Sequence, residues 1–508
     1  MSFAVPKPVP RIRFQDLVPW IVIAAGASSV LAHDWLAGAA IVLLGLAWCL
    51  LRESEGPPVL AFAFSFQWLQ LSLGVFYCGI VGRNVPTITR SDYRPMVMVG
   101  LVGLLALLLG LYCGRKLVRT KPARVAWQVP SFAFNIRELL VLYVASTLVA
   151  QLLLDAAWHY PRFTQALVAL ANFRLFFLFL LLRRLVRPRL EFGPFSLVVV
   201  GEILFGFTSY FASFKEPLFL ACLALSEAFD HRKLQHWLLL VVLGCVLLCC
   251  GVLWTGIKVP YRRDFQSQEF ANSRIDRLKR ISELSSRWLD KPLPQKLIEL
   301  DKMVDRLWAV YYPALAISRV PADVPHENGA ILVGAVKHIL MPRFLFPHKA
   351  PLESDSDKVF RYAGVKVAGA KQKTTIAFGY VAESYVDFGL PGMFAPIFVF
   401  GLLMGVSYQW FRAQIHHRDL AIAFVTLSYW LSLYLFERSW VRNLGLSITT
   451  IVCLGVGTIL LDRLLLAASG KRIVATRPRT GSGVLPAGAG FGIQRPLPPI
   501  PSGAGPGN

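Results

Sequence analysis

The sequence is poor in charged residues. They make up 16% of the 508 residues, whereas hydrophobic residues make up 55%. So much apolar surface cannot be buried in a soluble domain of this size, because only a bilayer offers it a dry environment. The composition therefore excludes a soluble globular protein and predicts a polytopic membrane protein.

Acidic residues are especially scarce. The chain has 30 Asp and Glu against 53 Lys and Arg, which gives a formal net charge of +23. In a soluble protein this excess would suggest nucleic-acid binding, but no nucleic-acid-binding motif is recognisable. We therefore expect no nucleic-acid partner and relate the basic residues to membrane topology.

Cysteine is missing from the hydrophilic parts of the chain. All eight cysteines lie in apolar runs, which excludes a disulfide framework or a thiolate zinc site in those parts. An acidic Asp355-x-Asp357 pair has the spacing of a Mg²⁺ or Mn²⁺ site. A helix start capped by Ser354 or Asp355 is the favoured interpretation. The sequence thus predicts neither a metal nor a cofactor.

Twelve apolar runs are long enough to cross about 30 Å of hydrocarbon. They begin near Leu17, Trp35, Pro58, Met96, Glu138, Gln165, Phe195, Pro217, Trp237, Leu390, Leu420 and Leu444. The polar pair His33-Asp34 separates the first run from the second. The predicted fold class is an all-α polytopic membrane protein with about 12 transmembrane helices.

The basic residues are distributed unevenly over the connections between these runs. With a cytoplasmic amino terminus, the inner segments carry 23 Lys and Arg and the short outer connections carry 7. Retention of cations in the cytoplasm predicts that both termini are inside. The pairs Arg115-Lys116, Arg183-Arg184 and Arg232-Lys233 are interpreted as orientation signals, with lipid binding as the alternative.

Four regions follow from this topology. Residues 1–255 form a bundle of nine spans, residues 256–389 a long outer loop, residues 390–461 three further spans, and residues 462–508 a cytoplasmic, mostly disordered tail. Apolar residues at helical spacing predict amphipathic helices at 273–289 and 297–311 in the loop. No internal repeat is recognisable.

The loop contains a proline-rich basic segment at 341–351. Three prolines fix the backbone while Arg343, His348 and Lys349 supply cations and an imidazole. A rigid backbone with an arginine suits an anion site, since the planar guanidinium matches phosphate oxygens. A solvated proline-rich turn is the alternative.

A group of polar residues follows at the outer end of the tenth span. If residues 380–387 are helical, Tyr380, Glu383 and Asp387 share one face, with Ser384 beside them. A partly buried Glu383 would suit a general base acting on a hydroxyl. In the alternative interpretation, Glu383 caps a helix or pairs with a nearby arginine.

Two further outer turns present cations next to spans. Lys215 lies in a turn of a few residues, and Arg438 and Arg442 are four residues apart, which predicts that they share one helical face. Ionisable residues at membrane depth are costly and argue for a task or a partner. Arg174 and Glu202, inside predicted spans, are expected to pair with each other.

Together these residues resemble a known family. The pattern Pro342-Arg343…Pro347-x-Lys349-x-Pro351, followed by Gly379-x3-Glu383-x5-Gly389-x2-Gly392 and a span with Gly401 and Gly405, is similar to the carboxy-terminal region of Wzy-type oligosaccharide repeat-unit polymerases of O-antigen and exopolysaccharide. The turn Ser213-x-Lys215 resembles a basic turn of that family. The sequence departs from the family in one respect. Some members have an Arg-x10-Gly pattern in their outer loops, whereas no arginine of the long loop here is followed by glycine eleven positions later.

The resemblance implies a fold related to membrane-embedded glycosyltransferases, without a metal, in the bacterial cytoplasmic (inner) membrane. It implies transfer of a glycan from a polyprenyl-diphosphate carrier to another lipid-linked repeat unit at the outer face. It implies that Arg343, Lys349, Glu383 and Lys215 have the functional roles of the matching residues in that family. The implied partners are the lipid-linked oligosaccharide, membrane lipids, a chain-length regulator and a flippase.

The mechanistic hypothesis combines both lines of argument. Arg343, Arg438 and Arg442 neutralise the diphosphate and Lys215 and Lys349 assist, while Glu383 or His348 accepts the proton of the acceptor hydroxyl. The rival functions are a lipid-linked-oligosaccharide flippase or transporter, and an O-antigen ligase. A flippase fits twelve spans but is usually built from related halves.

Overall fold

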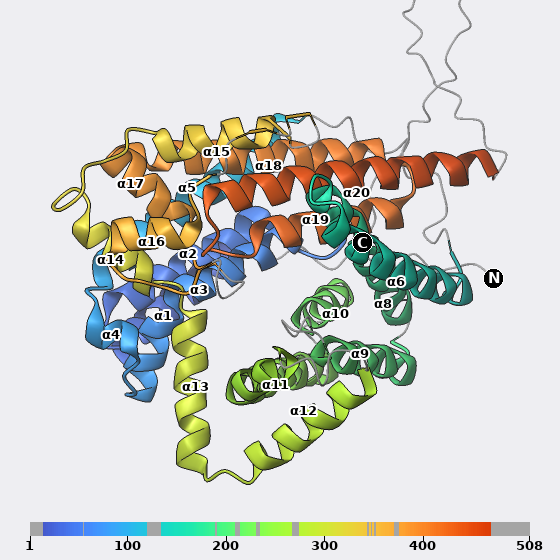
Figure 1. Ribbon diagram of the computed structural model, residues 1–508, viewed down its shortest axis with the longest axis horizontal. Coiled ribbons are helices and arrows are strands. Elements are labelled where there is room, and N and C mark those ends of the chain that lie inside the picture. The colour runs from blue at the N-terminus through green and yellow to red at the C-terminus, as the bar shows by residue number, and fades with distance from the viewer. Residues whose placement is uncertain are drawn as a thin grey trace, which may run out of the picture. The chain divides into compact units, whose positions relative to one another are not determined.

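The computed structural model describes residues 14–53, 55–118, 134–187, 190–208, 214–229, 234–266, 274–342, 345–346, 348–349, 352–369 and 375–468. These residues form α-helices and connecting turns, with no β-strand among them (Figure 1). The all-helical class predicted from the sequence is confirmed. Residues 462–468 of the predicted tail are helical, and Arg343 and the rest of that tail lie outside the described residues.

The helices are α1 (Phe14–Leu31), α2 (Trp35–Leu51), α3 (Val59–Val81), α4 (Pro86–Arg90), α5 (Arg94–Leu117), α6 (Ile136–His159), α7 (Thr164–Ala171), α8 (Phe173–Val186), α9 (Phe192–Phe207), α10 (Lys215–Glu227), α11 (Leu234–Gln266), α12 (Arg274–Leu289), α13 (Leu293–Leu307), α14 (Tyr311–Arg319), α15 (Ala330–Leu340), α16 (Asp355–Ala363), α17 (Tyr380–Gly392), α18 (Phe394–Gln414), α19 (Arg418–Leu433) and α20 (Trp440–Ala468).

Seven stretches of helix within the described residues are long and apolar enough to cross a membrane. They are α3, α5, α6, the pair α7 and α8, α11, α18 and α20. A helix occurs at each of the twelve predicted runs, but the others are shorter, so the count of about twelve spans stays a prediction. The chain has two compact units, Met1–Leu465 and Leu466–Asn508. The helix contacts that form the candidate site lie within the first unit.

Several local predictions are confirmed. The chain turns at His33, whose φ is 50°, and the Asp34 side chain then accepts the Leu36 amide at 3.0 Å as the N-cap of α2. Arg174 and Glu202 form the expected ion pair. Helices also occur at both amphipathic stretches of the long loop, as α12 and α13.

The boundary of the long loop differs from the prediction. The ninth span was expected to end before Gly256, but α11 continues to Gln266 and packs against α12 and α13. The second amphipathic helix ends at Leu307 rather than near Tyr311, because Trp308 turns inward and its indole Nε1 donates to the Leu71 carbonyl at 2.8 Å. The loop is therefore tied to the membrane helices.

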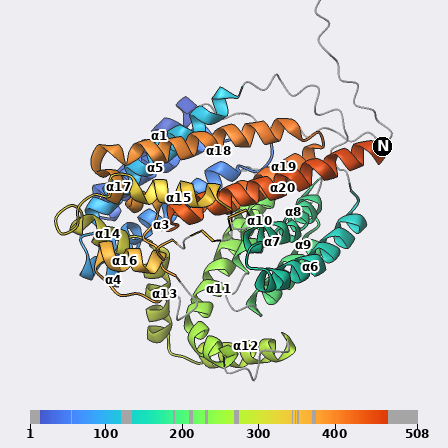
Figure 2. The same cartoon turned by 45° about the horizontal axis from the view of Figure 1, so that its top comes forward.

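Glycines bring α5 and α18 into close contact. A Cβ atom at Gly110 would lie 2.2 Å from the Phe398 carbonyl oxygen, and one at Gly405 would lie 2.4 Å from the Leu111 carbonyl oxygen. Small residues four apart on both helices allow this approach of backbones within a membrane. The packing fixes α18, and with it α17, against α5 (Figure 2).

The segments predicted to be cytoplasmic gather at one end of the helices. Arg115 pairs with Glu53 at 3.2 Å, and Arg183 pairs with Glu227 at 2.5 Å and also with Asp419. Arg183 is 2% exposed. The guanidinium groups of Arg115 and Arg183 join helices through carboxylates, and the interpretation of these pairs as orientation signals stays a prediction. Arg232-Lys233 lies outside the described residues.

Candidate functional site

The short turn of residues 434–439, between α19 and α20, is the centre of the candidate site. Two buried glutamines of α3 hold it: the Gln70 side-chain oxygen accepts the Phe436 amide at 2.8 Å, and the Gln67 side-chain nitrogen donates to the Leu433 carbonyl. The Tyr380 hydroxyl donates to Gln67 at 2.8 Å. Polar side chains in an apolar helix thus fix the turn and link it to α17.

A set of cations converges on one side of this turn. The cation cluster consists of Lys215 at the start of α10, Arg306 on α13 and Arg438 in the turn. Arg306 pairs with Glu437 at 2.6 Å, and the Arg438 guanidinium lies 4.9 Å from the centre of the Tyr434 ring. These members come from three segments that the sequence assigns to the outer side.

The cations of this cluster differ in how they are balanced. Arg438 donates to the Leu431 carbonyl at 2.5 Å. Lys215 is exposed to solvent, and it interacts electrostatically with Tyr434 and Glu437. Within the described residues, no ion pair joins Lys215 or Arg438 to a carboxylate. The cluster therefore keeps capacity for an external anion.

Helix α13 brings Arg306 to the turn. Asp301 accepts two hydrogen bonds from Arg83, at 2.9 and 2.5 Å, and one from the Tyr77 hydroxyl at 2.7 Å. Asp305 accepts the amide and the hydroxyl of Thr87 at 3.0 and 2.7 Å. Arg83 holds the pKa of the Asp301 carboxyl below its usual value despite desolvation. These bonds anchor the loop helix beside α3.

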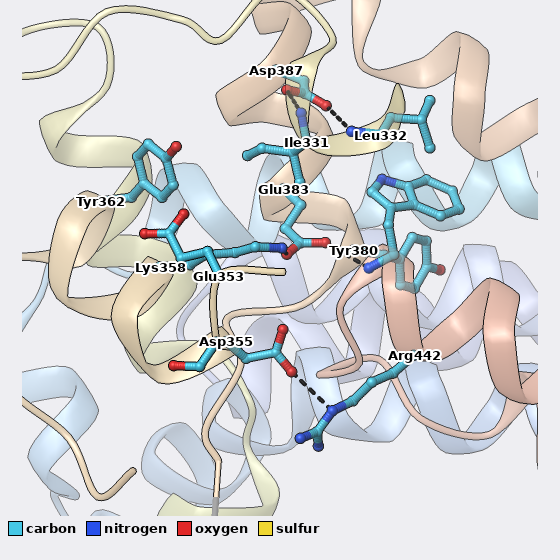
Figure 3. Close-up of polar contacts among 12 residues, drawn as sticks. Ile331, Leu332, Glu353, Asp355, Lys358, Tyr362, Tyr380, Glu383, Asp387 and Arg442 are labelled. Carbon is cyan, nitrogen blue, oxygen red and sulfur yellow. Dashed lines mark hydrogen bonds and ion pairs between the residues drawn. The ribbon is translucent and has the colours of Figure 1, made fainter. Parts of the chain in front are cut away.

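A second group of polar residues lies around the start of α20. This buried-carboxylate cluster consists of Glu383, Lys358, Asp355 and Arg442, and Figure 3 shows it. Lys358 donates to one Glu383 oxygen at 2.8 Å, and the Trp440 amide donates to the other at 2.5 Å. Arg442 pairs with Asp355 at 2.8 Å. Residues from α16, α17 and α20 thus meet around one carboxylate.

Burial controls the electrostatics of this cluster. Glu383 is 1% exposed and Lys358 is 7% exposed. Desolvation raises the pKa of the Glu383 carboxyl above its ordinary value, although Lys358 and the Trp440 amide act in the opposite direction. A carboxylate with a raised pKa suits proton transfer, provided that one of its oxygens becomes accessible.

The polar face predicted for residues 380–387 is confirmed. Tyr380, Glu383, Ser384 and Asp387 lie on α17 and are all buried. Asp387 accepts the amides of two residues at the start of α15, Ile331 at 3.0 Å and Leu332 at 2.8 Å. Desolvation raises the pKa of the Asp387 carboxyl, whereas these amides lower it. Asp387 thus positions the loop.

The alternative interpretation of Glu383 is also partly correct. Glu383 caps the first turn of α20, but its cationic partner is Lys358 rather than an arginine. The helix break at Gly389, where φ is 59°, then redirects the chain into α18. A glycine is required at this break because a side chain would strain the left-handed backbone.

The prediction that Arg438 and Arg442 share a helical face is wrong. Helix α20 begins at Trp440, because Gln70 and Glu383 bind the amides of Phe436 and Trp440 and hold residues 434–439 as a turn. Arg438 therefore belongs to the cation cluster, and Arg442 to the buried-carboxylate cluster.

The proline-rich segment contributes less than expected to these clusters. Lys349 donates to the carbonyls of His338 at 2.8 Å and Met341 at 2.7 Å, at the end of α15. A cation at a helix C-terminus satisfies terminal carbonyls. His348 is exposed, and Arg343 lies outside the described residues.

The acidic pair at 355–357 starts a helix. Ser354 is the N-cap of α16, and its hydroxyl oxygen accepts the Asp357 amide at 3.2 Å. The helix-start interpretation is confirmed. Among the described residues, no group of three His, Cys, Asp or Glu side chains is arranged to hold a metal ion.

Sequence reasoning missed Arg306, Lys358 and the two glutamines. Gln67 and Gln70 are three residues apart in an apolar run, which is itself a signal of a buried polar task. Arg306 and Lys358 lie on amphipathic helices and have no distinguishing local pattern.

The comparisons with known proteins add no relative. No family model matches the chain, and searches of curated proteins and of solved structures found no match.

Proposed function

We propose that the chain is a membrane-embedded glycosyltransferase that polymerises polyprenyl-diphosphate-linked oligosaccharide repeat units into a surface polysaccharide, at the outer face of the bacterial cytoplasmic membrane. The observation that carries the proposal is the cation cluster of Lys215, Arg306 and Arg438 beside apolar helices. A lipid-linked diphosphate is an anion that is presented at such a place.

The reaction needs cations at the leaving group. The acceptor hydroxyl oxygen forms a bond to the anomeric carbon while the bond from that carbon to the diphosphate oxygen breaks, and the polyprenyl diphosphate departs with the bonding electrons. Arg438 and Lys215 stabilise the charge that develops on that oxygen, since no carboxylate pairs with either within the described residues. Arg442, which pairs with Asp355 at the start of α16, assists.

The reaction also needs an acceptor for the hydroxyl proton. Glu383 is the proposed base, and its raised pKa suits that task. Because Lys358 occupies one of its oxygens, access requires that the Lys358 ammonium moves away from Glu383. The exposed His348 is the alternative base.

The glycans of a deletion strain test this function. We expect single repeat units when the gene is deleted, and long chains when the wild-type gene is restored. Long polymer without attachment would instead indicate a ligase, and lipid-linked repeat units that accumulate on the cytoplasmic face would indicate a flippase.

Point variants in the same strain test the residues. Arg438→Ala should leave single repeats while the protein stays in the membrane. The control is Arg287→Ala, which removes an exposed arginine of α12 far along the chain from the turn. Long chains of normal length in the Arg438→Ala strain would contradict the role of the cation cluster.

A further inference from the structure

Helix α20 has one face suited to lipid. Five large apolar side chains follow one another at four-residue spacing, and each is 44% to 67% exposed. They are Ile448, Val452, Val456, Leu460 and Leu464. An exposed apolar stripe on a candidate span is what contact with the hydrocarbon requires.

The opposite face of α20 is polar and buried. Five residues of α20 on this side are at most 2% exposed, and Ser439, directly before the helix, is fully buried. The set is Ser439, Asn443, Ser447, Thr450, Thr458 and Asp462. We call this set the polar seam. Leu454 interrupts it between Thr450 and Thr458. The helix thus directs its apolar side chains outward and its polar side chains into the protein.

Five side-chain oxygens of the polar seam have no hydrogen-bond partner among the described residues. They are the hydroxyls of Ser439, Ser447, Thr450 and Thr458 and the side-chain oxygen of Asn443. In contrast, the Thr449 hydroxyl donates to the Gly445 carbonyl at 2.7 Å within the same helix.

Burial without partners would be costly. A buried polar group without a partner costs about 1–3 kcal/mol, so five such groups on one face would cost a large part of a typical folding free energy. Internal water molecules are the usual partners of such groups.

Helix α19 adds hydroxyls along the same path. It runs antiparallel beside α20, because a short turn joins the helices at one end and His416 and His417 bind Asp462 at the other (Figures 1 and 2). The buried hydroxyls of Thr426 and Ser428 on α19 also have no hydrogen-bond partner among the described residues.

Ionisable groups stand at both ends of the polar seam. At one end, the two Asp462 oxygens accept the amides of His416 and His417, at 3.1 and 2.8 Å, and contact their imidazole Nδ1 atoms at 2.9 and 2.7 Å. At the other end, Ser439 precedes Trp440, whose amide donates to Glu383. Residues 439 and 462 are about 35 Å apart along a helix, compared with about 30 Å of hydrocarbon.

We infer that the polar seam holds a file of water molecules that relays protons between the Asp462 group and the Glu383 cluster. Each hydroxyl or water in such a file accepts one proton and passes on another, so no group is consumed. Glu383 has little access to solvent, and the file provides a route for its proton. The inference rests on the geometry of α19 and α20 and does not depend on the proposed polymerase activity.

Proton flux through the full-length protein tests the relay. The protein is reconstituted in liposomes that contain a pH-sensitive dye, with potassium and valinomycin to cancel the membrane potential, and acid is added outside. We expect faster acidification than in protein-free liposomes, and a several-fold slower rate for Thr450→Val and for Ser447→Ala. Thr449→Val is the matched control, since it removes a neighbouring hydroxyl with a partner in its own helix.

Two outcomes of the flux assay would contradict the inference. A wild-type rate equal to that of protein-free liposomes, or equal rates for Thr450→Val and Thr449→Val, would overturn the relay. The melting temperature of each variant is measured in parallel, so that a slower rate is read only from a folded protein.

Water in the polar seam can also be detected directly. Hydroxyl-radical labelling should modify Leu454, which is fully buried among the seam residues, faster than the lipid-facing Leu460, which is 55% exposed. Absence of label at Leu454 would show that the seam is dry and would overturn the inference. This measurement is independent of the polymer assay, so the seam and the proposed function can fail separately.

Discussion

Two groups of basic residues lie at opposite ends of the helices, and their side chains differ in the partners that they contact. At the end predicted to be cytoplasmic, Arg183 pairs with Glu227 and Asp419, and Arg187 pairs with Glu227 at 2.9 Å. The cations at this end are balanced by carboxylates, and Arg183 and Asp419 are almost fully buried. Their arrangement holds α8, α10 and α19 together.

The cation cluster at the other end is built on a different principle. Glu437 balances Arg306, whereas Arg438 contacts a carbonyl and an aromatic ring, and Lys215 is exposed. A buried pair contributes to cohesion, whereas cations without carboxylate partners remain available for a ligand. The number of arginines alone does not distinguish these uses, but the carboxylates around them do.

The largest expected effect separates the two groups by activity. Arg438→Ala should slow chain elongation on the order of 10²-fold, which is typical for the loss of one donor that stabilises a developing oxyanion. Elongation is measured with purified protein and lipid-linked repeat units, and the melting temperature is measured in parallel. An unchanged elongation rate would mean that Arg438 does not contact the leaving group.

The next effect separates them by stability. Arg183→Ala leaves Glu227 and Asp419 buried without their shared cation, so we expect a loss of about 3–5 kcal/mol in the free energy of unfolding. Thermal unfolding of the detergent-solubilised protein measures the loss, with the exposed Arg263→Ala as the control. Equal melting temperatures of these two variants would refute the structural role of the Arg183 ion pairs.

A smaller effect concerns pH. Lys358 favours the ionised form of Glu383, so Lys358→Met should raise the pKa of Glu383 further. If elongation needs ionised Glu383, the acidic limb of its pH profile should move to higher pH. A limb at the wild-type position, or one moved to lower pH, would exclude Glu383 as the titrating base.

The same raised pKa also affects stability. Because the native state holds the Glu383 proton more tightly than the unfolded state, the contribution of this group to stability should decrease as pH rises from the ordinary pKa of a glutamic acid through the raised value. Glu383→Gln should remove this slope, which unfolding at several pH values would show.

The smallest effect is expected at Asp387. Asp387→Ala removes the acceptor of two amides at the start of α15, which should cost about 1 kcal/mol, as does the loss of a helix cap. Glu283→Ala, a change at an exposed position of α12, serves as the control in thermal unfolding. A loss no greater than that of the control would show that Asp387 does not anchor the loop.

Local patterns allowed much of the fold to be predicted. The break at His33-Asp34, the cap at Ser354 and the polar face of Tyr380, Glu383 and Asp387 each depend on neighbouring residues. Such features follow from helix periodicity and capping, which a sequence shows directly.

The partners of the candidate site could not be predicted in this way. Arg306 and Glu437 are 131 residues apart, and Gln70 and Phe436 are 366 apart. These contacts depend on how the helices pack. The same packing makes α20 begin at Trp440, after Arg438. Lys358 is closer to Glu383 in sequence, at 25 residues, but a loop between them hides the pairing.

Direct binding of polyprenyl diphosphate to the protein in lipid nanodiscs tests the central claim. We predict that Arg438→Ala weakens binding at least about tenfold, or about 1.4 kcal/mol, whereas Arg187→Ala at the end predicted to be cytoplasmic leaves the affinity unchanged. Equal affinities of the wild type and Arg438→Ala, or a loss that occurs in Arg187→Ala instead, would contradict the account.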